Sequence, residues 1–211
     1  MSDDNVTPFR PRDGAMSHQD AAMAAQDQVI WEGDEPDGSR RVPVRVTRLE
    51  MRVKPTRHVA MPHGQRLGLL RLREVPTSFY RYMFNEVGRG HYWQLEPRQT
   101  DAELHGWLNS PDCEVHVVYV GGAPAGFFEL DLKRRTEAVA ISCFGLLPHA
   151  RGRGLARWFL SEAIRAAWSH EPPRLRLQTN SHDSPIALRL YQQMGFNVVG
   201  TTQGYLLVGS G

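Results

Sequence analysis

The chain is poor in lysine and cysteine and has no long apolar run. Its 211 residues include two lysines and two cysteines, and its nine histidines are scattered. The two cysteines, Cys113 and Cys143, are too few for a disulfide framework or a four-cysteine zinc site. No apolar run approaches the roughly 18 residues of a transmembrane helix, and the N-terminal residues lack the pattern of a secretory signal. We therefore expect a cytoplasmic protein that binds no metal and enters no membrane.

The two parts of the chain differ in charge. Residues 1–40 carry nine acidic residues and three arginines, a sum of −6, and few large apolar groups, so we expect a disordered acidic tail. A short helix over 17–29 fits this tail. Residues 41–211 carry 22 basic and 14 acidic residues, a sum of +8, and are expected to form one domain. A basic body attracts phosphate-bearing ligands, but no recognition helix or RNA-stacking motif favours nucleic acid.

Apolar periodicity predicts a sheet of short strands. VPVRVTRLEMRV, from residue 42, alternates as a half-buried strand does. Gly121 and Gly122 mark a turn that joins two strands in a hairpin, and the continuous apolar run over 137–146 indicates a central strand covered on both faces. The expected strands are 42–53, 66–75, 114–120, 125–133, 137–146, 174–180, 196–200 and 203–208.

Four helices are expected between these strands. Thr100 and Glu103 form a capping box, and residues 153–169 carry one apolar stripe at helical spacing. The other two helices cover 77–87 and a segment from about Ser184-Pro185 to Gly195. The expected fold is α+β, or three-layer α/β, with a mixed, mostly antiparallel sheet and helices on both faces.

The most informative segment lies between the central strand and the strongest helix. Glycines there leave backbone N–H groups accessible, and a helix N-terminus adds unpaired donors and the positive end of its dipole. A phosphate or pyrophosphate is the natural ligand; the alternative is a plain turn with solvated arginines. The segment contains no P-loop pattern, and Arg157 replaces the third glycine of a dinucleotide fingerprint.

Three motifs resemble one family. RGRGLA, residues 151–156, matches every fixed position of Q/R-x-x-G-x-G/A, the acyl-CoA-binding motif of the GCN5-related N-acetyltransferase (GNAT) superfamily. FGLLP, residues 144–148, is similar to the strand end that precedes that motif, and residues 187–196 are similar to the family pattern A-x-x-L-Y-x-x-x-G-F. The resemblance covers about 66–208, and 79–132 also resembles a bacterial acetyltransferase subgroup.

The resemblance implies that acetyl-CoA is the acyl donor. Backbone amides of 151–156 would hold its pyrophosphate, and the backbone of 144–146 would pair with the pantetheine arm where two central strands splay. Arg151 and Arg153 would add charge, or would be solvated. The expected cofactor-binding residues are Phe144, Gly145, Leu146, Arg151, Gly152, Arg153, Gly154, Leu155, Ala156, Asn180 and Ser184.

The resemblance also suggests roles for residues near the C-terminus. Tyr191 stands where the family places the general acid that protonates the leaving thiolate, although its spacing also fits the core face of a helix. Ser184 replaces an asparagine found in many members. Asn180 or Ser184 could still bind the cofactor, while a cap formed by Asp183 or Ser184 at the next helix is the favoured alternative.

The general base is less clear, because strand 137–146 has no acidic residue in its interior. Glu129, on the adjacent strand, is the first candidate, and its alternative is a solvent-facing carboxylate on the strand face of Phe127 and Asp131. His149 is the second candidate. Cys143 lacks a cysteine–histidine pattern and is expected to be a buried core residue.

The implied activity is direct transfer of an acyl group, most simply acetyl, from its CoA thioester to an amine of a small molecule or peptide. Aromatic residues of the first helix and the segment after it could line the acceptor site or pack in the core. A non-catalytic acyl-CoA sensor and an interaction subunit that uses the acidic tail are the alternatives, and a homodimer is compatible with either. These aromatic residues are Phe79, Tyr80, Tyr82, Phe84, Tyr92 and Trp93.

Overall fold

Seven strands form one sheet in the order β2-β3-β4-β5-β6-β1-β7 in the computed structural model, which describes residues 39–93 and 100–209. Neighbouring strands are antiparallel except β5 and β6, which are parallel. The predicted class, with its mostly antiparallel sheet, is confirmed. The strands are β1 (Ser39–Met51), β2 (Leu67–Arg71), β3 (Cys113–Val120), β4 (Ala123–Asp131), β5 (Val139–Leu146), β6 (Leu175–Asn180) and β7 (Asn197–Gly209).

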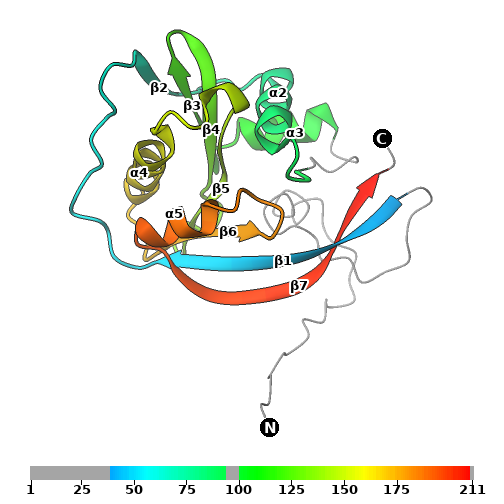
Figure 1. The fold of residues 1–211 in the computed structure, drawn as a ribbon. Coiled ribbons are helices and arrows are strands. Elements are labelled where there is room, and N and C mark those ends of the chain that lie inside the picture. The colour runs from blue at the N-terminus through cyan, green and yellow to red at the C-terminus, as the bar shows by residue number, and fades with distance from the viewer. Residues whose placement is uncertain (1–38, 94–99, 210–211) are drawn as a thin grey trace.

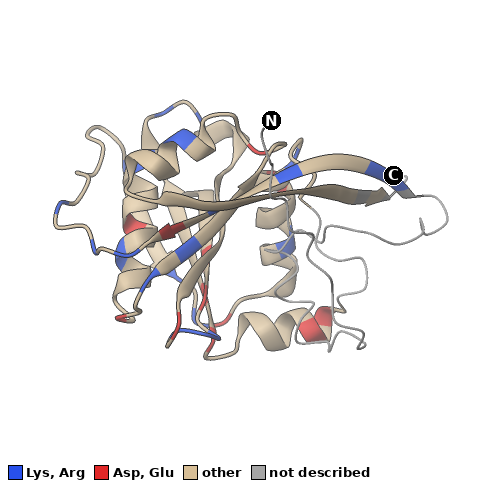
Figure 2. Ribbon diagram, turned by 90° about the horizontal axis from the view of Figure 1, so that it is seen from below, with Lys and Arg blue, Asp and Glu red and all other residues tan. Residues whose placement is uncertain are grey.

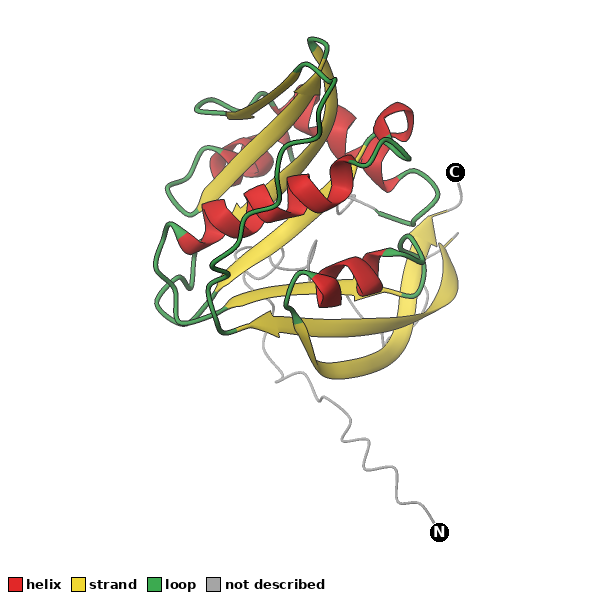
Figure 3. Ribbon diagram, turned by 60° about the vertical axis from the view of Figure 1, so that its left-hand side comes forward, coloured by secondary structure: helices red, strands yellow, loops and turns green. Residues whose placement is uncertain are grey.

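Helices cover both faces of the sheet (Figure 1). Helices α2 (Thr77–Gly88) and α3 (Asp101–Leu108) lie on one face, and α4 (Leu155–Trp168) and α5 (Ala187–Gln193) lie on the other (Figure 3). None of the helices in the described ranges is long and apolar enough to cross a membrane. Of the predicted tail, only Ser39 and Arg40 fall within the described residues, as the start of β1, and the predicted helix over 17–29 lies outside them.

Local signals in the sequence place several elements correctly. The predicted capping box is present at α3: Glu103 N donates to Thr100 Oγ1 at 3.2 Å, and Thr100 N donates to Glu103 Oε2 at 2.9 Å. Strands β3 and β4 form the predicted hairpin. These features form from residues close in sequence, and short-range hydrogen bonds suffice to specify them.

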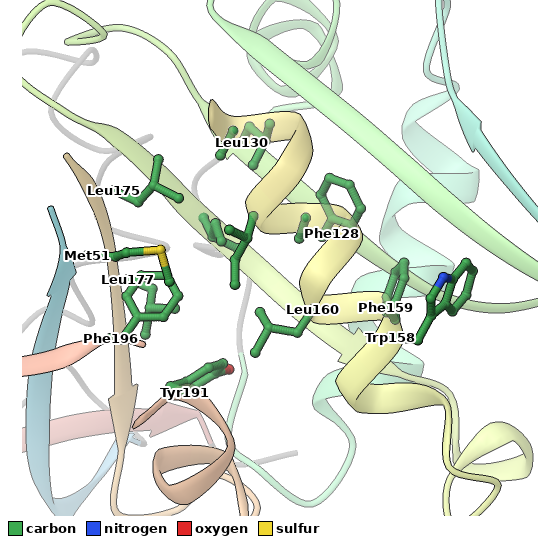
Figure 4. Packing of buried hydrophobic residues seen from close by; sticks show 14 of the residues in the cluster. Met51, Phe128, Leu130, Trp158, Phe159, Leu160, Leu175, Leu177, Tyr191 and Phe196 are labelled. Carbon is green, nitrogen blue, oxygen red and sulfur yellow. The ribbon is translucent and has the colours of Figure 1, made fainter. Parts of the chain in front are cut away.

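The sheet separates two apolar cores. The α4-side core packs Phe159 and Leu160 of α4 against Phe128 and Leu130 of β4, and Tyr191 of α5 belongs to it (Figure 4). The α2-side core contains Tyr80, Met83, Phe84, Phe127 and Cys143, all buried. Alternate residues of β4 therefore face different cores, as the pleat of a strand requires.

The last strand differs from its prediction. Two short strands were expected over 196–200 and 203–208, but β7 is one strand that pairs with β1 from Asn197 opposite Glu50 to Gly209 opposite Ser39. The segment around Gly200 remains extended because β1 offers it an antiparallel partner along its whole length. The first and last described strands are thus neighbours, with β1 between β6 and β7.

Two other boundaries are shifted. Strand β2 ends at Arg71 rather than at residue 75, and α5 begins at Ala187, after a turn, rather than near Ser184.

Basic and acidic residues are interspersed over several strands and helices (Figure 2). β1 alone contributes Arg40, Arg41, Arg45 and Arg48.

Candidate acyl-CoA site

The two parallel strands at the centre of the sheet separate soon after they meet. Strands β5 and β6 pair only at Val139 with Leu175 and at Ala140 with Arg176. On its other side β5 stays paired with β4 as far as Leu146. The edge of β5 that faces β6 is therefore unpaired with that strand beyond Ala140. A ligand with amide groups could pair with this edge as an added strand does.

A glycine-containing loop joins the end of β5 to α4. After a short 3₁₀ helix (Pro148–Ala150), Gly152 and Gly154 both adopt left-handed backbone conformations, with φ of 72° and 75°. Gly154 is the N-cap of α4, and no side chain caps the helix. A Cβ at either glycine would meet nothing within 4 Å. The backbone at these two glycines thus borders open space at the uncapped N-terminus of α4, and free amides of such a terminus can bind an anion.

Arg151 has a role that neither sequence-based alternative described. Its Nε donates to the Leu146 carbonyl at 3.0 Å, and its guanidinium also donates to the Val87 carbonyl at 2.9 Å. The side chain ties the loop to the end of β5 and to the C-terminal turn of α2. Arg153 is exposed, and its carbonyl accepts a hydrogen bond from Gln65 Nε2 at 3.2 Å.

Several of the remaining predicted residues of the loop and strand are constrained by packing within the domain. Phe144 packs on Phe159 and Tyr191, with ring centroids 5.2 and 6.3 Å apart. Gly145 leaves room for α2, because a Cβ there would lie 2.1 Å from Val87 Cγ1. The side chain of Leu155 is buried in the α4-side core, with Ala156 packed against it.

These features lie in a segment that matches a known family. Residues 69–196 match the model of the Acetyltransferase (GNAT) family, and this match covers more than half of the chain. The chain belongs to the GNAT family. A search of curated proteins found no match.

Solved structures share the fold of this GNAT domain at low sequence identity. A GNAT-family protein from Novosphingobium aromaticivorans has a TM-score of 0.57 and 17% identity, over 85% of this chain and 71% of that one. A GCN5-related N-acetyltransferase from Sphaerobacter thermophilus has a TM-score of 0.53 and 16% identity, over 93% and 58%. The spermidine/spermine N-acetyltransferase SpeG of Vibrio cholerae has a TM-score of 0.50 and 20% identity, over 67% and 95%.

Glu129, the first candidate for the base, is not the solvent-facing carboxylate that its strand position allowed. It is 3% exposed, and its side chain extends from β4 of the GNAT domain toward α2 and α3. Tyr80 Oη donates to Oε2 at 2.6 Å, Ser142 Oγ donates to Oε1 at 2.9 Å, and Trp107 Nε1 lies 3.4 Å from Oε1. The net pKa of Glu129 is raised. Burial raises it, and the hydrogen bonds from these three donors, which lower it, offset that effect only in part.

The sequence analysis did not predict that Ser142 contacts Glu129. The register between β4 and β5 shifts between Glu129 and Leu130, whose partners are Cys143 and Ile141. Ser142 is therefore the extra residue of a β-bulge, and bulges redirect side chains. No spacing in the sequence signals this bulge, because it depends on how two strands pair.

Cys143 is a buried core residue, as predicted. Its Sγ lies 3.9 Å from Tyr80 Oη. Burial, with the neighbouring Glu129 carboxylate, raises the pKa of the thiol well above its ordinary value. A thiol that resists ionisation is a poor nucleophile.

Tyr191 is buried in the α4-side core on the helix face that periodicity predicted. Its ring lies near Phe196, and its hydroxyl points away from that residue toward α4 (Figure 4). Within residues 39–93 and 100–209 no hydrogen-bond partner holds this hydroxyl. Burial, with smaller contributions from Asp183 and Cys143, raises the pKa of Tyr191.

The segment after β6 does not form the predicted helix cap. Asp183 instead accepts hydrogen bonds from Thr179 Oγ1 at 2.8 Å, Asn180 N at 2.9 Å and Trp93 Nε1 at 3.0 Å. The residue before α5 is Ile186, which makes no side-chain cap. Asn180 is also engaged locally, because its Oδ1 accepts from His182 N at 2.7 Å. Ser184 is half-buried, and its carbonyl accepts from Ala187 N.

The segment that follows α2 reaches the segment that follows β6. Besides the Trp93–Asp183 bond, His91 Nδ1 lies 2.8 Å from the His182 carbonyl, and the Tyr92 ring packs edge-on against His182 at 5.0 Å. Tyr92 has a φ of 55°, which is strained for a residue with a side chain. This contact joins elements from both sides of the splay.

The aromatic residues of α2 differ in burial. Tyr80 and Phe84 pack in the α2-side core, whereas Tyr82 is 49% exposed. His149, the second candidate for the base, is exposed in the 3₁₀ helix. Among the described residues, no group of three or more histidine, cysteine or acidic side chains could hold a metal ion.

Proposed function

We propose that this chain is an acyl-CoA-dependent N-acyltransferase that transfers acetyl from acetyl-CoA directly to an amine of a small molecule or peptide. The observation that carries the proposal is the uncapped N-terminus of α4, reached through Gly152 and Gly154, beside the splay of β5 and β6. A pyrophosphate on the loop amides and a pantetheine arm along β5 would fit this arrangement.

In the proposed reaction the neutral amine attacks the thioester carbonyl, and the tetrahedral intermediate expels the CoA thiolate. As it collapses, its nitrogen loses one proton to leave the amide, and the sulfur takes up that proton to leave CoA as the free thiol. The amine must first lose a proton, because an alkylammonium has a pKa of about 10. Glu129 is the proposed proton acceptor. Its burial supports the role, since a carboxylate with a raised pKa binds a proton more readily.

Tyr191 is the proposed donor to the leaving sulfur. Because burial raises its pKa, full transfer of its proton to a thiolate is energetically uphill. Tyr191 therefore stabilises the thiolate as a hydrogen-bond donor. The Tyr191 hydroxyl has no hydrogen-bond partner among the residues that the structure describes. This supports the role, since the hydroxyl is available to donate to the sulfur.

The acceptor would approach from the α2-side face. The exposed Tyr82 and Tyr92 offer ring faces that attract a cationic or apolar amine. We place the protein in a reducing compartment such as the cytoplasm, because Cys113 and Cys143 are both free.

A non-catalytic acyl-CoA sensor is the second candidate. The burial of Glu129 favours it, because a buried carboxylate is not accessible for direct contact with an amine. Calorimetry with acetyl-CoA tests the shared cofactor site. Wild type should bind, more weakly at higher salt, and Gly154→Glu should not bind because its carboxylate occupies the anion site. Gly154→Ala, with the same backbone strain and no charge, is the matched control.

A screen of primary amines with detection of released thiol then separates the two candidates. Turnover supports the transferase. Binding without thiol release from any amine supports the sensor. A folded wild type that fails to bind acetyl-CoA would overturn both.

A further inference from the structure

Glu129 is closed off from a substrate by the side chains that hold it. Glu129 is 3% exposed, and Tyr80 Oη donates a hydrogen bond to Oε2 at 2.6 Å. An amine cannot contact Oε2 without displacing Tyr80, which is itself buried. The titratable and polar groups around the carboxylate are Tyr80 of α2, Trp107 of α3, Asp131 of β4, Cys113 of β3, and Ser142 and Cys143 of β5.

Ser142 is a neighbour of Glu129 that also reaches the surface. It is half-buried, as is Trp107, whereas Tyr80 and Cys143 are buried. It stands two residues beyond Ala140, the last residue of β5 that pairs with β6, and so lies where the splay opens. The β-bulge turns its Oγ toward Glu129, 2.9 Å from Oε1 and 2.9 Å from the Glu129 carbonyl.

We propose that Ser142 is a proton relay that carries the proton of the acceptor amine to Glu129. This inference rests on the proposed acyltransferase function. The ammonium group passes one proton to Ser142 Oγ while the hydroxyl of Ser142 passes its own proton to Glu129 Oε1. The amine becomes neutral, the serine is unchanged, and Glu129 becomes a neutral carboxylic acid.

The surroundings favour this direction of transfer. A buried carboxylate is stabilised by protonation, because the neutral acid is less costly to bury. Trp107 and Tyr80 hold the carboxyl in place. The hydroxyl of Ser142 has one proton, which it can donate to only one acceptor at a time, the carbonyl or the carboxylate of Glu129. The lone pairs of Ser142 Oγ stay available to accept a proton from an amine.

The relay is tested with Ser142→Ala and the rescue variant Ser142→Thr. The probes are phenethylamine and spermidine, whose amines have pKa values near that of lysine, about 10, and a tetrapeptide whose α-amino group has a pKa of about 8. For Ser142→Ala we expect kcat/KM for the alkylamines to fall about 100-fold at neutral pH, the size of a general-base contribution. The KM for acetyl-CoA should not change.

The loss should depend on pH and on the amine in a way that a packing defect would not. It should shrink as the pH rises toward the amine pKa, where neutral amine is present without a base. It should be smaller for the tetrapeptide, and Ser142→Thr should recover most of the activity. Ser161→Ala is the matched control, since it removes another buried hydroxyl, which bonds the Trp158 carbonyl in α4.

The outcomes separate the relay from the enzyme. If wild type acetylates a probe and Ser142→Ala matches it at every pH, or loses the same factor at every pH and with every amine, the relay is wrong and the acyltransferase stands. If wild type binds acetyl-CoA but acetylates none of the three probes or the wider amine screen, both proposals fall and the sensor remains.

Discussion

The hydroxyl of Tyr80 donates a 2.6 Å hydrogen bond to the buried carboxylate of Glu129. Removing it in Tyr80→Phe should lower the free energy of unfolding by about 1.5–3 kcal/mol at neutral pH, the usual contribution of a hydrogen bond to a charged group. The bond also lowers the pKa of Glu129, so its loss should raise that pKa further and move the acidic limb of the pH–rate profile to higher pH. Urea unfolding and the pH profile measure the two effects.

Tyr82→Phe is the control for this prediction, since Tyr82 lies on the same helix but is exposed. Equal stability of Tyr80→Phe and wild type would contradict the prediction.

Tyr191→Phe should reduce kcat and leave the fold intact. The hydroxyl has no partner among the described residues, so its removal strands no buried group. Loss of one donor to a developing anion lowers kcat by about 10²-fold or more. Acetyl-CoA affinity, measured by calorimetry, should be unchanged; an unchanged kcat would leave Tyr191 with packing alone.

Arg151→Ala should destabilise the domain and weaken acetyl-CoA binding together. Its two bonds, to the carbonyls of Leu146 and Val87, hold the loop against β5 and α2, and their loss should cost about 1–2 kcal/mol. Arg153→Ala should change stability by less than about 0.5 kcal/mol, as exposed substitutions do. Thermal unfolding with and without acetyl-CoA compares the variants, and equal behaviour of the two would refute the anchoring role.

Gly145→Ala should be destabilising because of one neighbour. The new Cβ would lie 2.1 Å from Val87 Cγ1, so α2 or β5 must move, at a cost of about 1–3 kcal/mol. Adding Val87→Ala removes the obstructing methyl and should recover part of the loss. Urea unfolding of both variants is the measurement, and a double variant no more stable than Gly145→Ala would argue against this contact.

Glu114→Gln should reveal a pH-dependent stabilisation far from the proposed reaction centre. Glu114 is 4% exposed, with Arg71 at 2.8 Å, His116 at 3.1 Å and His170 at 3.0 Å from its carboxylate. Burial raises the pKa of Glu114, but its hydrogen bond to His116 and the charges of Arg71 and His170 outweigh this, and the net pKa is lowered.

A lowered folded-state pKa means that Glu114 stabilises the protein above its ordinary pKa of about 4.3 and loses this effect as the pH falls through the folded-state value. Glu114→Gln should therefore be less stable than wild type near neutral pH by about 1–2 kcal/mol, with the difference vanishing in acid. Urea titrations over this range test the prediction, with the exposed Glu137→Gln as control. A difference that persists in acid would point to packing.

Sequence alone determined the elements that depend on neighbouring residues. The capping box of Thr100 and Glu103, the apolar stripe of α4 and the motif RGRGLA are local patterns, and each gave the correct element or family. Hydrogen bonds between residues three or four apart and helical periodicity require no knowledge of distant segments.

Tertiary structure decided the rest. Glu129 is buried because Tyr80, 49 residues away in sequence, packs on it, and Ser142 faces it because β4 and β5 pair with a bulge. Arg151 bonds a carbonyl of α2, 64 residues away, and β7 is continuous because β1 pairs along its length. Each depends on which distant segments meet, and a strand's own residues do not specify its partner, its register or what covers its face.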